Sequence, residues 1–265
     1  IKFLDSSDTE DMLKCQAEFA SLNHGMVVKF EDEVRAMASD SESKRIGYVE
    51  DGKLKGYAVY SFASESEVNY TLNRIEISEL IYLEPAVLRA FLGFFRNQSD
   101  LAQNIVIRTG EEDFYHALPS AQDVSGNYID FGFLQTNVSA IGTMYKIVDL
   151  ANFVEVTSHR AFPAANLTVA FDYYDELAHR SESFSVRFEA EPDGKVARWH
   201  VCSSGDSCDV RIKACLADIS SLLMGSCRLS SLVRLGSAQL SDSGYEVLLD
   251  SLFYYKQKPW TNTDY

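Results

Sequence analysis

The sequence predicts an α+β protein of two domains. Its 265 residues exceed the usual size of a single hydrophobic core. Apolar residues make up 46% and charged residues 24%, as in ordinary globular proteins, so the chain has enough apolar surface to order. Strand-like runs alternate with helical patterns, and their character changes near Asp149. We therefore predict a first domain over 1–148 and a second over 149–265.

The first domain begins with helices and a hairpin. Ser7 to Glu10 has the spacing of a capping box, so we expect it to open a helix that buries Leu13, Ala17 and Ala20. A second helix is predicted over 30–38. Two strand-like runs over 46–62 flank Asp51-Gly52, a strong hairpin signal. These patterns predict the start of a sheet.

The rest of the first domain continues this sheet. A strand is expected over 73–84, and Pro85 occupies the first position of a helix with a broad apolar stripe. The following ranges predict a strand, a helix-like segment, a loop and two apolar runs: 104–110, 111–118, 120–127, 128–135 and 141–150.

The second domain is predicted to be a sheet with helices on one face. Helices are expected over 149–160, 217–227 and 243–255, and strands over 166–175, 183–190, 195–204 and 208–216. The last helix is predicted to turn four residues inward: Val247, Leu248, Phe253 and Tyr254.

Charge limits the partners. The formal net charge of -15 repels nucleic acid and anionic lipid and attracts cations, although acidity can also serve solubility alone. No apolar run approaches the roughly 18 residues of a membrane span, and residues 1–12 lack the features of a signal peptide. We expect a cytoplasmic protein with a cationic partner, no nucleic acid and no membrane.

Familiar catalytic and metal-binding motifs are missing from the sequence. The histidines stand apart from cysteine and carboxylate clusters, so no metal site is predicted: His24, His116, His159, His179 and His200. The cysteines are odd in number and scattered, which indicates free thiols: Cys15, Cys202, Cys208, Cys215 and Cys227. Cys202 and Cys208 could still be bridged across a turn under oxidising conditions.

A resemblance builds along the chain. The stretches GYAVYSF (56–62), ISELIYLEPAVLRAFLGFFRNQ (77–98) and MYKIVDLANFVEV (144–156) resemble the second GNAT-type lobe of the Eis (enhanced intracellular survival) acetyltransferases, with Lys146 where arginine is usual. The segments 216–240 and 248–265 resemble the family's C-terminal domain of sterol-carrier-protein-like fold. The resemblance therefore implies a GNAT-like lobe followed by a sterol-carrier-protein-like domain.

The resemblance also implies a function. Eis proteins are acetyl-CoA-dependent amine N-acetyltransferases in which a first GNAT lobe binds acetyl-CoA on a Gly-containing turn, and this sequence has no Arg/Gln-x-x-Gly-x-Gly/Ala. Because residue 1 is Ile, we expect this chain to be the acceptor side and scaffold of a longer, oligomeric enzyme. Alone it is expected to be inactive. The acidic balance suits a cationic small-molecule or peptide amine as acceptor.

Two residues are candidates for the site. In the family the terminal α-carboxylate of a final aromatic residue acts as a base, which implies this role for Tyr265, with Asp264 adding negative potential for a cationic amine. The competing reading is an ordinary frayed terminus. A second hypothesis for the whole chain is an apolar-ligand (lipid) binding or regulatory module with a cavity near Phe171, Phe184, Phe188 and Leu222, although such residues more often form a packed core.

Overall fold

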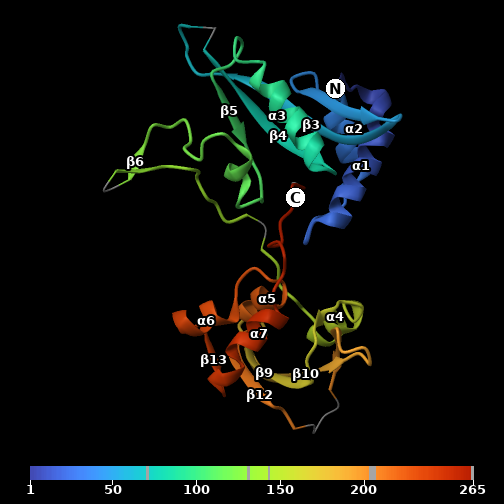
Figure 1. Ribbon diagram of the computed structural model, residues 1–265, viewed down its shortest axis with the longest axis vertical. Helices are drawn as coiled ribbons and strands as arrows, with labels where there is room; N and C mark the ends of the chain where they lie inside the picture. The colour runs from blue at the N-terminus through green and yellow to red at the C-terminus, as the bar shows by residue number, and fades with distance from the viewer. Residues whose placement is uncertain (70–71, 130–131, 143, 203–206, 264–265) are drawn as a thin grey trace. The chain divides into compact units, whose positions relative to one another are not determined.

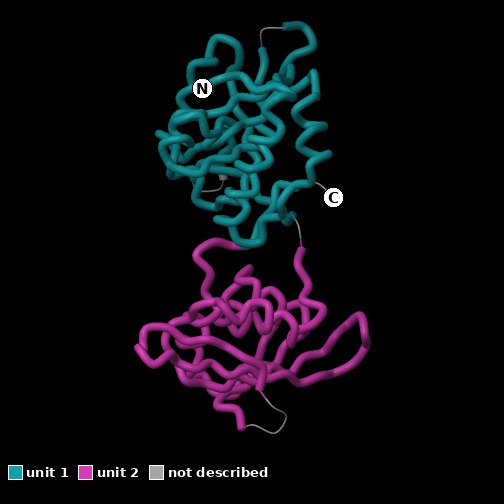
Figure 2. Tube along the Cα trace, turned by 90° about the vertical axis from the view of Figure 1, so that its right-hand side faces the viewer, with its two compact units in different colours: residues 1–142, 259–265 teal, residues 143–258 magenta. Residues whose placement is uncertain are grey.

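The computed structural model describes the chain except residues 70–71, 130–131, 143, 203–206 and 264–265. The chain divides into unit 1, residues 1–142 with 259–265, and unit 2, residues 143–258 (Figure 2). The predicted boundary after residue 148 lies near this division. Assigning 259–265 to the second domain was wrong, because this segment packs within unit 1.

Unit 1 is built on a five-stranded mixed sheet in the order β1-β2-β3-β4-β5 (Figure 1). Its strands are β1 (Lys2–Phe3), β2 (Lys44–Glu50), β3 (Lys53–Ser64), β4 (Asn73–Tyr82) and β5 (Asn104–Ile107). Neighbours from β1 to β4 run antiparallel, and β5 runs parallel to β4. The predicted hairpin is confirmed: Asp51 and Gly52 join β2 to β3 with φ of 50° and 73°, the left-handed values that a tight hairpin turn requires.

Helices cover both faces of this sheet (Figure 1). On one face α1 (Thr9–Leu22) and α2 (Glu31–Ser39) pack against Tyr57, and on the other α3 (Pro85–Arg96) packs against Tyr60. Helix α1 buries Met12, Cys15, Gln16, Phe19 and Ala20. The prediction is confirmed for Ala20, whereas Leu13 and Ala17 are only partly buried. The capping box lies at Asp5 and Asp8 of a preceding 3-10 turn, η1 (Ser6–Asp8), and not at Ser7.

A β-bulge interrupts β4 at Ser78. Val59 of β3 lies opposite Glu79, and the next residue, Tyr60, lies opposite Ile77, so Ser78 has no partner of its own. Because side chains alternate along a strand, one extra residue moves those that follow to the other face. Ile77 therefore packs on the α3 side, whereas Glu79 and Ile81 turn toward the side of α1 and α2.

The second half of unit 1 is less regular than predicted. Strand β5 pairs only with the first part of β4, Arg74–Ile77. The expected helix over 111–118 is reduced to a 3-10 turn, η2 (Phe114–Ala117), which ends just before the helix-breaking Pro119. Strands β6 (Tyr128–Ile129) and β7 (Phe133–Leu134) form a separate two-stranded sheet. Among the described residues, no strand extends the pairing of β5 along β4 beyond Ile77.

Unit 2 has a six-stranded mixed sheet in the order β13-β12-β9-β10-β11-β8. The strands are β8 (Phe162–Pro163), β9 (Leu167–Asp175), β10 (Arg180–Ala190), β11 (Val196–Val201), β12 (Val210–Cys215) and β13 (Ala238–Leu240). Its helices are α4 (Leu150–Val156), α5 (Leu216–Leu223), α6 (Leu229–Leu235) and α7 (Glu246–Leu252). They share one hydrophobic core with the sheet, centred on Phe171, Phe188 and Trp199. None of the helices in the described part of either unit has the length and apolar composition that a bilayer crossing needs.

The final helix corrects one prediction. Helix α7 buries Leu249 and Leu252, followed by Phe253, whereas Val247 and Tyr254 are exposed. The apolar residues of 247–254 are too closely spaced for the pattern to select one face. Helix α6 was not predicted from the sequence. It ends at Gly236, which has the left-handed conformation (φ 81°), and β13 follows.

Candidate functional site

The most unusual group in unit 1 is a buried carboxylate. Glu79 is 5% exposed and lies between an apolar sheet face and Asn262, near the end of the chain. The bulge at Ser78 directs it there, beside Tyr57 of β3, whose side chain is fully buried. Burying a charged group in an apolar setting is costly unless it is paired and hydrogen bonded.

Three neighbours satisfy Glu79. Its Oε1 accepts hydrogen bonds from the Tyr57 hydroxyl at 3.1 Å and from Asn262 Nδ2 at 2.9 Å. Its Oε2 lies 4.0 Å from Nζ of Lys29, another buried side chain. Lys29 also donates to Glu33 Oε1 at 2.5 Å and to the backbone carbonyl of Asn262 at 3.1 Å. We call Lys29, Tyr57, Glu79 and Asn262 the Glu79 cluster.

Burial changes the acidity of this cluster. Loss of hydration raises the pKa of Glu79 to about 7, against the opposing effects of Lys29 and of the hydrogen bonds from Tyr57 and Asn262. Burial, together with the adjacent carboxylate, also raises the pKa of the Tyr57 hydroxyl. Glu79 therefore changes charge near neutral pH, within the range useful for proton transfer.

The acidity of Glu79 predicts how stability depends on pH. Between its ordinary pKa of 4.5 and the folded value of about 7, the unfolded chain has released this proton while the folded chain holds it. Stability therefore falls as pH rises through that window. The Glu79→Gln variant cannot titrate at this position. The difference between its free energy of unfolding and that of wild type should therefore grow by about 3 kcal/mol from pH 4.5 to 7, in favour of the variant, and stay constant above pH 7. Urea unfolding across this range measures it, and a difference independent of pH would contradict the assignment.

The C-terminal segment, Pro259–Thr263, leads to the predicted site residues. Asp264 and Tyr265 lie outside the described residues, so their assigned roles stay predictions. The described segment before them contacts the Glu79 cluster through Asn262. Sequence analysis missed Lys29, Tyr57, Glu79 and Asn262, although a carboxylate within the apolar run ISELIYL is a signal that could have found Glu79.

Some side-chain atoms near this segment are buried without a hydrogen-bond partner in the described chain. They include Trp260 Nε1, Asn262 Oδ1 and Thr263 Oγ1. Such groups are rare in folded proteins because each forfeits its bonds to water. The Asn262 and Thr263 oxygens therefore retain capacity to accept hydrogen bonds next to the predicted site residues.

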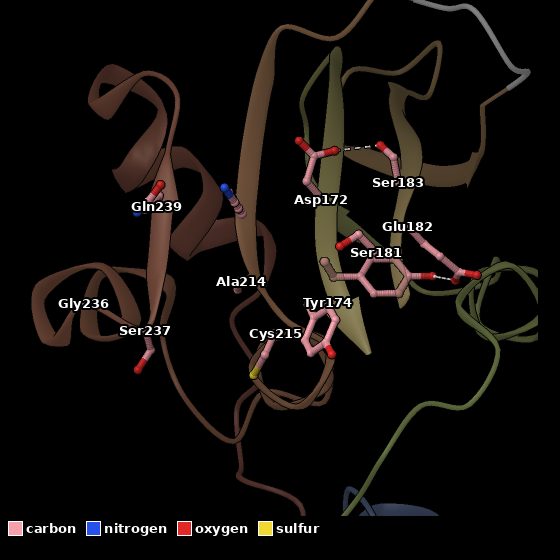
Figure 3. Close-up of a pocket in the computed structure, with 12 residues that line it drawn as sticks. Asp172, Tyr174, Ser181, Glu182, Ser183, Ala214, Cys215, Gly236, Ser237 and Gln239 are labelled. Carbon is pink, nitrogen blue, oxygen red and sulfur yellow. Dashed lines mark hydrogen bonds between the residues drawn. The ribbon is translucent and has the colours of Figure 1, made fainter. Parts of the chain in front are cut away.

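Unit 2 carries a separate pocket of about 690 Å³ (Figure 3). It is lined from β9, β10, β12, β13 and the turn after α6, by mostly polar residues such as Asp172, Ser181 and Glu182. Its carboxylates already have partners: Asp172 accepts from the hydroxyl of Ser183 and Glu182 from that of Tyr173.

The residues considered for an apolar cavity lie elsewhere in unit 2. Phe171, Phe188 and Leu222 are fully buried in the core, and Phe184 packs against it. This arrangement favours the packed-core reading. The thiols of Cys15, Cys208, Cys215 and Cys227 are free, as predicted. In the described chain, no three His, Cys, Asp or Glu residues are grouped so that they could hold a metal ion.

Comparison with known proteins identifies the class of fold. Residues 25–132 match the family model of the acetyltransferase (GNAT) domain. Search of curated proteins finds no match. Among solved structures, a probable N-acyltransferase from Enterococcus faecalis V583 aligns with a TM-score of 0.73 and 16% identity, covering 100% of this chain and 61% of that one.

Two further structures show the same relationship. Eis1 from Mycobacterium abscessus aligns with a TM-score of 0.66 and 17% identity, covering 100% of this chain and 62% of that one. A GCN5-related N-acetyltransferase from Kribbella flavida aligns with a TM-score of 0.63 and 16% identity, covering 100% and 59%. At these identities the likeness concerns the fold. The chain spans about three fifths of the length of these structures.

Proposed function

We propose that this chain is the acceptor side and scaffold of an acetyl-CoA-dependent amine N-acetyltransferase. Unit 1 would be a second GNAT-like lobe and unit 2 a sterol-carrier-protein-like domain. The observation that carries the proposal is the placement of the C-terminal segment, which leaves unit 2 and docks on the Glu79 cluster of a GNAT-type sheet. The GNAT domain match and the fold shared with acetyltransferases along the whole chain support it.

The helices of unit 1 do not fit acetyl-CoA. Its pyrophosphate needs backbone N–H groups at a helix N-terminus free of negative charge. Helix α1 instead begins with Glu10 and Asp11, and α2 with Glu31, Asp32 and Glu33. Helix α3 begins with Glu84 at its cap and Pro85, which has no N–H. We therefore assign acetyl-CoA to a lobe outside this chain.

This chain would contribute the proton acceptor. An alkylammonium acceptor must lose a proton before its nitrogen can attack an acetyl group. The terminal carboxylate of Tyr265 would take that proton. The negative charge of Asp264 would attract the acceptor while it is still cationic. The oxygens of Asn262 and Thr263 that lack a partner among the described residues would add acceptors for the N–H groups of the same substrate.

The partner proposals follow from charge and family. The net charge of -15 suits a cationic small-molecule or peptide amine and disfavours nucleic acid. A homo-oligomer of the full-length protein and a cytoplasmic location come with the resemblance. Sedimentation of the intact protein tests the first of these directly.

Calorimetry tests whether acetyl-CoA binds to this chain or to a lobe outside it. Titration of this chain with acetyl-CoA should show no binding tighter than about 1 mM, because unit 1 presents carboxylates where phosphates would dock. The intact protein should bind acetyl-CoA and acetylate polyamines, aminoglycosides or lysine peptides. Micromolar binding by the 265-residue chain would contradict the coenzyme assignment, and an intact protein inert toward every amine would refute the proposed activity.

A further inference from the structure

The C-terminal segment is wedged into unit 1. The backbone N–H of Trp260 donates to the carbonyl of His24 at 3.1 Å, and its indole meets the ring of Phe19 edge-on, with centroids 6.1 Å apart. On another side the indole lies so close to Gly110 that a Cβ at that position would come within 2.6 Å of Trp260 Cβ. A glycine after β5 therefore leaves the space that Trp260 fills.

Two residues beyond Trp260, the segment is held at two points. Asn262 donates its side-chain amide to Glu79 at 2.9 Å and accepts at its backbone carbonyl from Lys29 at 3.1 Å. These contacts come from two separate parts of the chain: Glu79 lies on β4, just after the bulge, and Lys29 precedes α2. The hold on Asn262 thus fixes both its side chain and its backbone.

Lys29 is itself fixed from α1. The backbone N–H of Lys29 donates to Gln16 Oε1 at 3.0 Å, and Gln16 Nε2 donates to the carbonyl of Val27 at 2.9 Å. Gln16 is fully buried. A buried amide has no water to replace its hydrogen bonds when they break. One that bonds to two backbone groups of a loop therefore holds that loop rigidly.

These polar groups bring little stability to the core. A buried ion pair with its hydrogen bonds is often no more stable than apolar residues of the same volume. A leucine in place of Glu79 could pack against the apolar sheet face lined by Tyr57, Val59 and Ile81. The cluster therefore contributes position more than stability: it holds one residue of the C-terminal segment in one place.

From this geometry we infer that Glu79 and Lys29 are positioning residues that anchor the chain end through Asn262. Tyr265 follows Asn262 by three residues in the sequence, and three residues span at most about 11 Å, so an anchor at Asn262 limits the reach of the chain end. The catalytic consequence rests on the proposed role of Tyr265 as base. The anchor itself does not depend on that role and can be measured without catalysis.

Tryptophan fluorescence measures the anchor. The chain has two tryptophans, so Trp199→Phe leaves Trp260 as the only one. In that background Asn262→Ala and Glu79→Ala should raise acrylamide quenching of Trp260 about twofold or more, because the freed segment opens locally. Glu79→Gln keeps an oxygen acceptor for Asn262 and should restore the wild-type value. Glu76→Ala, on the same strand with its carboxylate on Arg74, is the matched control and should change nothing.

A second variant tests the wedge without touching the cluster. Gly110→Ala should displace Trp260 and raise its quenching as Asn262→Ala does, with the far-ultraviolet circular dichroism unchanged. If Glu79→Ala fails to fold, Gly110→Ala and Asn262→Ala still decide the question. Unchanged quenching in both would overturn the inference.

Kinetics of the intact protein separate the anchor from the proposed function. If the anchor positions the base, Asn262→Ala should lower kcat about 10- to 100-fold with a smaller change in the KM for acetyl-CoA, because a base displaced by an ångström or more loses its geometry. If Trp260 is released and kcat stays the same, both the positioning role of the anchor and the role of Tyr265 as base are refuted. If Trp260 stays in place while extension of the chain end still abolishes turnover, the inference fails and the proposed function stands.

Discussion

One residue appended after Tyr265 should lower kcat of the intact enzyme by about 10²- to 10⁴-fold, which is the usual contribution of a general base. Only a chain end carries an α-carboxylate, so the added residue replaces that charge with a neutral peptide carbonyl at the same place. Binding of acetyl-CoA should be unchanged. Steady-state kinetics with saturating acceptor, together with calorimetric titration of the coenzyme, measure both quantities.

Two variants separate the carboxylate from the aromatic ring. Tyr265→Phe keeps the α-carboxylate and a ring of similar shape, so its kcat should stay within about threefold of wild type. Deletion of Tyr265 moves the carboxylate back by one residue and should be as damaging as the extension. An extended enzyme with unchanged turnover would show that the chain end is an ordinary terminus.

Local sequence signals predicted much of unit 1. The β2–β3 hairpin followed from Asp51-Gly52, and α3 followed from Pro85 and the spacing of Val87, Phe91 and Phe95. Each of these rests on residues close in sequence, whose conformations are set by φ preferences or by one helix face. Such signals work without knowledge of the tertiary structure.

The bulge at Ser78 could not be read from the sequence. An extra residue in a strand is defined by the register with its neighbour, and ISELIYL is apolar at most positions on both sides of Ser78. Without the bulge, Glu79 would be assigned to the same face as Ile77. The Glu79 cluster therefore depends on a pairing that becomes visible only in the folded sheet.

The placement of the C-terminal segment is a second long-range feature. Its contacts join Asn262 to Lys29 and Glu79, which are far away along the chain, and no short pattern encodes them. The family resemblance implied a role for the last residue, but it did not indicate what holds the segment. The exposed Val247 and Tyr254 show the same limit at smaller scale, because an apolar residue in a short helix can lie on either face.

Hydrogen exchange at the Trp260 amide shows whether the C-terminal segment is an ordered part of unit 1. This N–H donates to His24 across the wedge, so exchange requires the segment to open. We expect the amide in the folded chain to exchange about 100-fold or more slowly than in a synthetic peptide of residues 256–265, since opening must disrupt the packing of Trp260 and both bonds of Asn262. Exchange at the same rate in chain and peptide would contradict it, because the segment would then be a frayed terminus.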